Sequence, residues 1–221
     1  MTYSLVDFCG DVRAILAESD NHDGRQRVRR QLEALLDDAD FRAAYLGADE
    51  DGMTQIYEDP DFRFCVLAYK MAAAHSSPPH DHGDSWAVYG QALGHTDMTV
   101  WSQPDEGNRI EPKRTFRLEA GQADLFDVRE IHSISYCHGA KFVRVTGVDM
   151  RALSRGARGA RPSQERALSR GARGARPSQE RALSRGARGA RPSQGSVEPR
   201  RVFDPETGEV HEVASVGTSR R

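Results

Sequence analysis

The chain has 221 residues, 38% of them apolar, with 31 basic and 33 acidic side chains and a formal net charge of −2. This length predicts one domain of ordinary size plus an appendage. We expect neither a membrane span nor an N-terminal signal peptide, because the sequence lacks the apolar runs that both require. The three cysteines, Cys9, Cys65 and Cys137, are scattered, which indicates reduced thiols and a cytoplasmic protein.

Residues 1–50 predict a small helical region that packs on the domain after it. Apolar residues recur there at the three- and four-residue spacing of amphipathic helices. The sequence Asp-Asn-His-Asp-Gly at 20–24 predicts a break with capping residues. The predicted apolar faces are Leu5, Phe8, Val12, Ile15 and Leu16, then Val28, Leu32, Leu35 and Leu36, and then Phe41, Ala44 and Tyr45 in a shorter helix.

From Thr54 onward the pattern changes to short strands, and residues 51–150 predict one β domain. Runs rich in aromatic and branched residues alternate with turn sequences such as Pro-Asp-Glu-Gly-Asn at 104–108. Many short strands at this spacing are typical of a sandwich or a barrel. The expected strands are 62–69, 85–93, 96–101, 115–118, 123–126, 132–136 and 141–146.

His80 and His82 stand two residues apart, and a third histidine, His132, follows on a later predicted strand. Alternate side chains of an extended strand share one face, so the pair presents both imidazoles to the same space. Three imidazoles would hold Fe, Zn, Cu or Ni and leave coordination positions open. The alternative is that these are unrelated surface histidines. His95 and Asp84 are weaker candidates beside this group.

The spacing around these histidines resembles the two sequence motifs of the cupin superfamily. In the first motif a histidine pair is followed by glutamate and then glycine, and Ala87 and Gly94 occupy those positions here. In the second motif a glycine precedes a histidine, as Gly121 precedes His132. The chain departs from the two motifs at Ala74, Ala87, Asp127, Arg129 and Tyr136.

Among cupins the chain resembles the thiol dioxygenases, and cysteine dioxygenase above all, over roughly residues 5–149. Those enzymes bind Fe(II) through three histidines and no glutamate, which agrees with Ala87. The resemblance implies a mainly β fold, the cupin double-stranded β-helix (jelly-roll barrel), with a small N-terminal helical region. It also implies that His80, His82 and His132 bind Fe(II), and that a small thiol reacts with O2 to give a sulfinate.

The residues around the metal depart from this family. Ala87 cannot form the cysteine–tyrosine crosslink of animal-type cysteine dioxygenase, and the family's Ser-x-His-x-Tyr run is absent from 141–146. A substrate carboxylate would call for an arginine, and Arg63 and Arg144 are the candidates. The aromatic residues that would line a pocket are Trp86, Tyr89 and Tyr136, and no catalytic residue beyond the metal ligands is assigned.

Each of these assignments has a simpler alternative. The two arginines would be surface cations, and the aromatic residues would be core. For the whole chain, the alternatives are another metal-dependent cupin enzyme acting on a non-thiol small molecule, with another divalent transition metal, or a cupin that binds a metal or ligand without catalysis.

Residues 151–194 consist of a 15-residue sequence, RALSRGARGARPSQE, in three tandem copies, the last of which stops at Gln194 and has Gly195 in place of the final glutamate. The segment carries twelve arginines and two glutamates, and each copy has one leucine as its only large apolar residue, so we expect a disordered insert. Clustered arginine would bind polyanions weakly. The segment has no aromatic residues that could stack on bases, and this argues against a nucleic-acid partner. Residues 195–221 form a tail in which 203–209 predicts the turn of a small hairpin.

Overall fold

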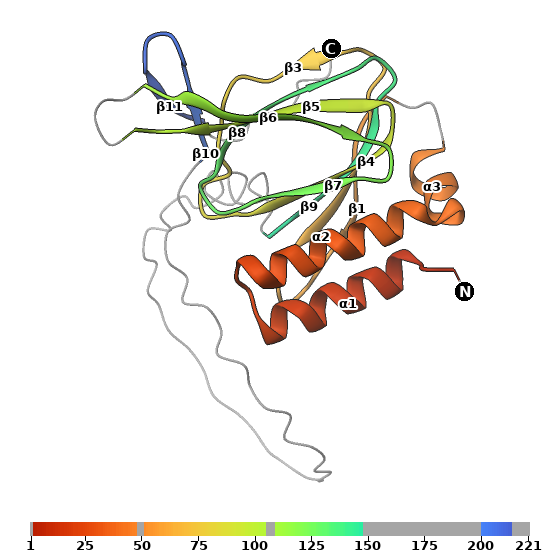
Figure 1. Cartoon of the computed structure of the whole chain (residues 1–221). Helices are drawn as coiled ribbons and strands as arrows, with labels where there is room; N and C mark the ends of the chain where they lie inside the picture. The colour runs from red at the N-terminus through yellow and green to blue at the C-terminus, as the bar shows by residue number, and fades with distance from the viewer. Residues whose placement is uncertain (1, 48–50, 105–108, 148–199, 214–221) are drawn as a thin grey trace, which may run out of the picture.

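A computed structural model of the chain describes residues 2–47, 51–104, 109–147 and 200–213. The insert predicted at 151–194 lies outside the described residues. Figure 1 shows the helices and strands, which are α1 Leu5–Glu18, α2 His22–Asp37, α3 Ala39–Leu46, β1 Gly52–Glu58, β2 Cys65–Lys70, β3 His75–Ser76, β4 Ala87–Leu93, β5 His95–Ser102, β6 Glu111–Glu119, β7 Ala123–Phe126, β8 Ile131–Tyr136, β9 Lys141–Thr146, β10 Arg200–Phe203 and β11 Val210–Val213.

The predicted N-terminal helical region is confirmed. The side chain of Ser4 accepts a hydrogen bond from the backbone of Asp7, and the Asp7 side chain accepts one from the backbone of Ser4, so α1 begins with a capping box. The N-cap side chains of Asn21 and Asp38 each accept one backbone hydrogen bond, from Gly24 at the start of α2 and from Phe41 at the start of α3. Most residues of the predicted apolar faces are buried. None of the helices in the described part of the chain is long and apolar enough to cross a membrane.

Two antiparallel sheets form the β domain. One has the strand order β1-β2-β9-β4-β7 and the other β3-β8-β5-β6. From β3 to β9 the chain crosses repeatedly between the two sheets and stays in one sheet only from β5 to β6. The sheets face each other, and α1 and α2 lie against the outer side of the five-stranded sheet (Figure 1). This is the double-stranded β-helix, or jelly roll, that the sequence predicts.

The five-stranded sheet is buried on both faces. Its outer face packs on the helices through residues such as Val66, Val88 and Val145, which belong to the helix-side core. Its inner face contributes Tyr89 and Phe142 to a second core between the sheets, together with residues of β5, β6 and β8. Burial on both faces explains why β2 begins with four consecutive buried residues, whereas β5 alternates between more and less buried positions.

One strand begins later than the sequence predicts. The strand expected over 62–69 starts at Cys65, because a turn occupies the residues before it. Asp59 holds this turn, since its carboxylate accepts hydrogen bonds from the backbone N–H groups of Asp61 and Phe62 at 2.9 and 2.8 Å. Arg63 follows in the left-handed region with φ 61°.

The segment 79–82, called here the histidine segment, is extended but is not a regular strand. The spacing of His80 and His82 predicts a regular extended strand, which the structure does not show. In the structure only His80 forms β-bridges, one to His132 of β8 and one to Val202 of β10. The segment thus lies between β8 and the C-terminal hairpin.

The C-terminal hairpin pairs β10 with β11 around a turn at 204–209, where Gly208 has φ 74°. It docks on the histidine segment through two backbone hydrogen bonds, from Phe203 N to Pro79 O at 2.9 Å and from Asp81 N to Arg201 O at 3.1 Å. The fully buried carboxylate of Asp81 also accepts hydrogen bonds from the backbone and side chain of Arg201 at 2.9 and 2.7 Å. These contacts fix the histidine segment from the side opposite β8.

Gly90 of β4 allows α2 to pack closely on the sheet, since a Cβ at this position would lie 2.6 Å from Leu36 and 2.8 Å from Leu32. We expect Gly90→Ala to lower the free energy of unfolding by about 1–3 kcal/mol through overpacking. Gly10→Ala is the matched control, because its Cβ would meet nothing within 4 Å in α1. It should raise stability by about 0.5–1 kcal/mol. Urea unfolding measures both, and equal effects would contradict this account of the helix–sheet contact.

Candidate metal centre

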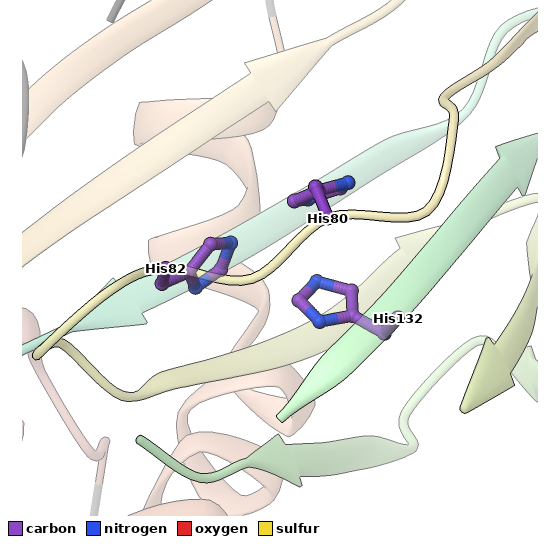
Figure 2. Close-up of side chains that lie close together, drawn as sticks. All are labelled: His80, His82 and His132. Atoms are coloured by element: carbon purple, nitrogen blue, oxygen red, sulfur yellow. The ribbon is translucent and has the colours of Figure 1, made fainter. Parts of the chain in front are cut away.

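Three histidines meet inside the barrel. One ring nitrogen from each of His80, His82 and His132 lies within 4.8 Å of the other two. The exposed fractions of the three residues are 3%, 7% and 0%. Figure 2 shows the three rings converging, two from the histidine segment and one from β8. The structure therefore contains a buried group of side chains that could hold a metal ion.

Backbone pairing sets the separation of the rings. His80 and His132 exchange two hydrogen bonds, from His80 N to His132 O at 2.8 Å and from His132 N to His80 O at 2.9 Å. Because directly paired residues place their side chains on the same face, the two rings stand side by side with centroids 4.5 Å apart. The His82 ring completes the group at 4.9 Å from the His132 centroid.

Two of the rings are oriented by backbone carbonyl groups. His80 Nδ1 lies 2.9 Å from Pro78 O, and His132 Nδ1 lies 3.2 Å from Glu130 O. A carbonyl oxygen only accepts, so each Nδ1 carries the proton and each Nε2 keeps its lone pair. His132 Nε2 is buried and has no hydrogen-bond partner among the described residues. This is the arrangement of a histidine that offers Nε2 to a metal.

Burial lowers the pKa of all three histidines. Desolvation, and then the neighbouring His132, hold the pKa values of His80 and His82 well below the ordinary range. Desolvation also lowers the pKa of His132 to about 3, against the opposing effect of its hydrogen bond to Glu130. The imidazoles are therefore neutral near neutral pH, which is the form that binds a metal.

Tyr89 and Arg144 lie beside the histidines on the inner face of the five-stranded sheet. The Tyr89 hydroxyl lies 3.4 Å from His82 Nε2 and 3.5 Å from a terminal nitrogen of Arg144. Phe126 stacks on the His132 ring with centroids 4.0 Å apart. The histidines thus contact the aromatic ring of Phe126 and lie beside the hydroxyl of Tyr89 and the guanidinium of Arg144.

Arg200 is a residue of this interior that sequence reasoning missed. Its positive charge disfavours protonation of each of the three histidines, and desolvation lowers the pKa of its own guanidinium. The residue follows the repeat insert, 118 positions after His82, and no local pattern marks it. Only the pairing of β10 with the histidine segment places it here.

The structure separates the other candidate residues. Tyr136 lies on β8 with His132 and belongs to the core between the sheets, where its ring is 5.6 Å from that of Phe142. Trp86 belongs instead to the helix-side core. Arg63 is exposed and pairs with Glu58 at 3.0 Å beyond the barrel interior.

The alternation along β4 explains these positions. Ala87 and Tyr89 belong to the core between the sheets, whereas Trp86 and Val88 belong to the helix side. In many cupins the residue at the motif position of Ala87 binds the metal, so its side chain points into the barrel. Residues two apart on a strand share a face, and this rule alone predicts that Tyr89 points inward and that Trp86 does not. Asp84 pairs with Arg129 at 3.0 Å, and neither Asp84 nor His95 is part of the histidine group.

Comparisons with known proteins found distant structural neighbours and no relative by sequence. No protein-family model matches the chain, and no curated protein matches it. Similar solved structures include KdgF from Halomonas sp. (15% identity, 42% of this chain and 76% of that one, TM-score 0.34). They also include the Cnp3 cupin domain of Schizosaccharomyces pombe (14% identity, 50% of this chain and 72% of that one, TM-score 0.35). A third is a cupin superfamily protein of Desulfitobacterium hafniense (13% identity, 46% of this chain and 80% of that one, TM-score 0.35). At these TM-scores the fold assignment rests on the strand topology itself.

Topology and site together define the class of protein. The chain is a double-stranded β-helix that holds three buried histidines between its sheets. Three nitrogen donors with no carboxylate among them suit a divalent transition metal such as Fe, Zn, Cu or Ni, and do not choose among these.

Single replacement of His80, His82 or His132 by Ala should remove most of the bound metal, because each supplies one of three donors. Metal content after reconstitution and desalting measures the loss. His138→Ala is the control, since His138 lies exposed in the turn after β8 and outside the group. Full occupancy in any one of the three variants would remove that residue from the ligand set.

The metal-free protein should lose stability as the pH falls below about 6.5, where unfolded histidines take up protons. His132 stays neutral in the fold down to about 3. The unfolded chain therefore binds more protons in this window, and the free energy of unfolding falls by up to about 1.4 kcal/mol per pH unit for this residue.

Urea unfolding between about pH 7 and about pH 5 tests this dependence. His132→Gln should give a shallower slope than the wild type, whereas His138→Gln should leave the slope unchanged. Equal slopes for His132→Gln and the wild type would show that His132 takes up its proton in the fold as readily as in the unfolded chain.

Proposed function

We propose that the protein is a thiol dioxygenase that binds Fe(II) through His80, His82 and His132. The observation that carries this proposal is the neutral donor set, three buried imidazoles with Ala87 directed inward where a carboxylate ligand would otherwise stand. Three neutral ligands leave the full positive charge of the ion available to an anionic thiolate. The sequence resemblance to three-histidine thiol dioxygenases points to the same chemistry.

The reaction adds both atoms of O2 to one sulfur, so that a thiol RSH and O2 give a sulfinic acid RSO2H. Sulfur supplies all four electrons that O2 accepts, and no further reductant is needed. Bound Fe(II) would supply the coordination positions at which thiolate and O2 meet. A small thiol and O2 are thus the proposed partners.

The protein's own residues would bind and orient the substrate. The Tyr89 hydroxyl, next to His82 and Arg144, can donate a hydrogen bond to a group held at the histidines or relay a proton to it. Tyr69 and Phe142 stack with centroids 4.6 Å apart, and Phe126 stacks on His132, so aromatic rings surround the place that the substrate would occupy. We place this proposed activity in the cytoplasm, because an odd and scattered set of three cysteines suits a reducing compartment.

Oxygen uptake tests the proposed function. The protein, loaded with Fe(II) under anaerobic conditions, is mixed with cysteine, 3-mercaptopropionate or cysteamine in oxygenated buffer. We expect one O2 consumed per thiol and a sulfinate product for at least one substrate. The His132→Ala variant should show no uptake, and His138→Ala should behave as the wild type. No uptake with iron confirmed in place would reject a dioxygenase acting on these thiols and leave another cupin activity or binding alone.

A further inference from the structure

His82 is held less directly than the other two histidines of the group. His80 and His132 pair with each other through their backbones, and a backbone carbonyl lies at the Nδ1 atom of each ring. In the part of the chain that the structure describes, the His82 ring has one hydrogen-bond contact, the Tyr89 hydroxyl at 3.4 Å. Its direction therefore depends on the backbone on either side of it.

The carboxylate of Asp81 closes a turn around His82. Its Oδ1 atom accepts a hydrogen bond from the backbone N–H of Gly83 at 3.1 Å, so the side chain before His82 is bonded to the backbone after it. Gly83 has φ 57°, in the left-handed region that favours glycine. Aspartate commonly forms this local turn with the N–H group two residues on. The turn sets the direction in which the His82 side chain leaves the backbone.

The C-terminal hairpin holds the same carboxylate. Oδ1 of Asp81 also accepts from the backbone N–H of Arg201 at 2.9 Å, and Oδ2 accepts from Arg201 Nε at 2.7 Å. A terminal nitrogen of the guanidinium lies 2.6 Å from Oδ2. Because Asp81 is fully buried, its charge is stable there only beside this partner. One side chain thus joins the turn around His82 to the docked hairpin.

We propose that Asp81 is a positioning residue of the metal centre. It acts through the turn to Gly83, which directs the His82 ring toward the other two histidines, and Arg201 acts by holding Asp81 in that turn. Metal binding and docking of the C-terminal hairpin then stabilise each other, because a coupling between two equilibria is reciprocal. This inference rests on the metal site of the proposed function, but not on the reaction at that metal.

Asp59 provides a matched comparison within the same chain. It is also fully buried, accepts from the backbone N–H two residues on, and pairs with an arginine, Arg13. The side chains of Arg13 and Arg201 are similarly exposed, at 37% and 31%. Asp59 belongs to the turn before β2 and not to the histidine group. Its loss removes a similar buried ion pair without changing the surroundings of His82.

Charge and position predict opposite results for Arg201. Removing a positive charge reduces the repulsion of a metal ion, so charge alone predicts tighter binding in Arg201→Met. The positioning role predicts binding that is weaker by about 10- to 100-fold, as for other residues that orient metal ligands. Arg201→Lys should recover part of the affinity, because the charge returns without the planar fork.

The variant Asp81→Leu/Arg201→Met removes both charges and leaves no buried charge unpaired, which keeps the test open if Arg201→Met does not fold. It should also bind the metal about 10- to 100-fold more weakly than the wild type. Arg13→Met and Asp59→Leu/Arg13→Met are the controls, and they should lose stability without losing metal affinity. Melting temperature shows which variants are folded.

Fe(II) affinity is measured under argon by competition with a chromophoric chelator. Hydrogen exchange, followed by mass spectrometry with and without Fe(II), gives a second measurement. In the wild type, bound metal should slow exchange in the segment 200–203, which bonds to the histidine segment but contains none of the three histidines. Exchange in the turn at 59–62 should not change, which separates local docking from a general gain in stability.

Each result decides for or against the role of Asp81. Weaker Fe(II) binding in the folded Arg201 variants, with unchanged binding in the controls, would support it. Wild-type affinity in Asp81→Leu/Arg201→Met, tighter binding in Arg201→Met, an equal loss in the controls, or exchange at 200–203 that metal leaves unchanged would overturn it. A wild type that binds no Fe(II) would overturn both this role and the metal site. Coupled binding without O2 uptake from any thiol would keep the role of Asp81 and reject the dioxygenase.

Discussion

The paired charges of Asp81 and Arg201 are the constraint on which the rest of the site depends. Asp81 is fully buried, and its carboxylate accepts from Arg201 and from the backbone of Gly83. Such a charge is tolerable only while its partner is in place. The contact thus joins a short irregular segment to a hairpin encoded far downstream. Both histidines of the segment and the Arg200 side chain are positioned as a result.

The barrel provides a rigid support for the contact between the histidine segment and the C-terminal hairpin. Because the five-stranded sheet is packed on both faces, its inner side chains have little freedom, and Tyr89 and Arg144 are held at fixed places beside the histidines. The histidine segment itself has few sheet contacts, and it is immobilised by β8 on one side and β10 on the other. A precise site is thus built on a piece of chain that would not hold its shape alone.

The sequence predicted those features that depend on local spacing. The helices followed from the repetition of residues such as Val28, Leu32 and Leu35, and the fold followed from short strands and motif spacing around His80 and His132. The environment of Arg200 could not be predicted, because it depends on the register between segments separated by the insert. The late start of β2 was missed because Asp59 bonds to the backbone and competes with strand formation.

The alternation of the histidine segment also limits how this gene can change. Within three consecutive residues, the two histidines face the interior and the aspartate faces the opposite way, toward Arg201. A one-codon insertion or deletion inside this triplet would exchange the two faces for every residue beyond it. The carboxylate would then be directed into the barrel interior, and an imidazole would be directed toward the guanidinium of Arg201. We therefore expect descendants of this sequence to vary in side chains here long before they vary in length.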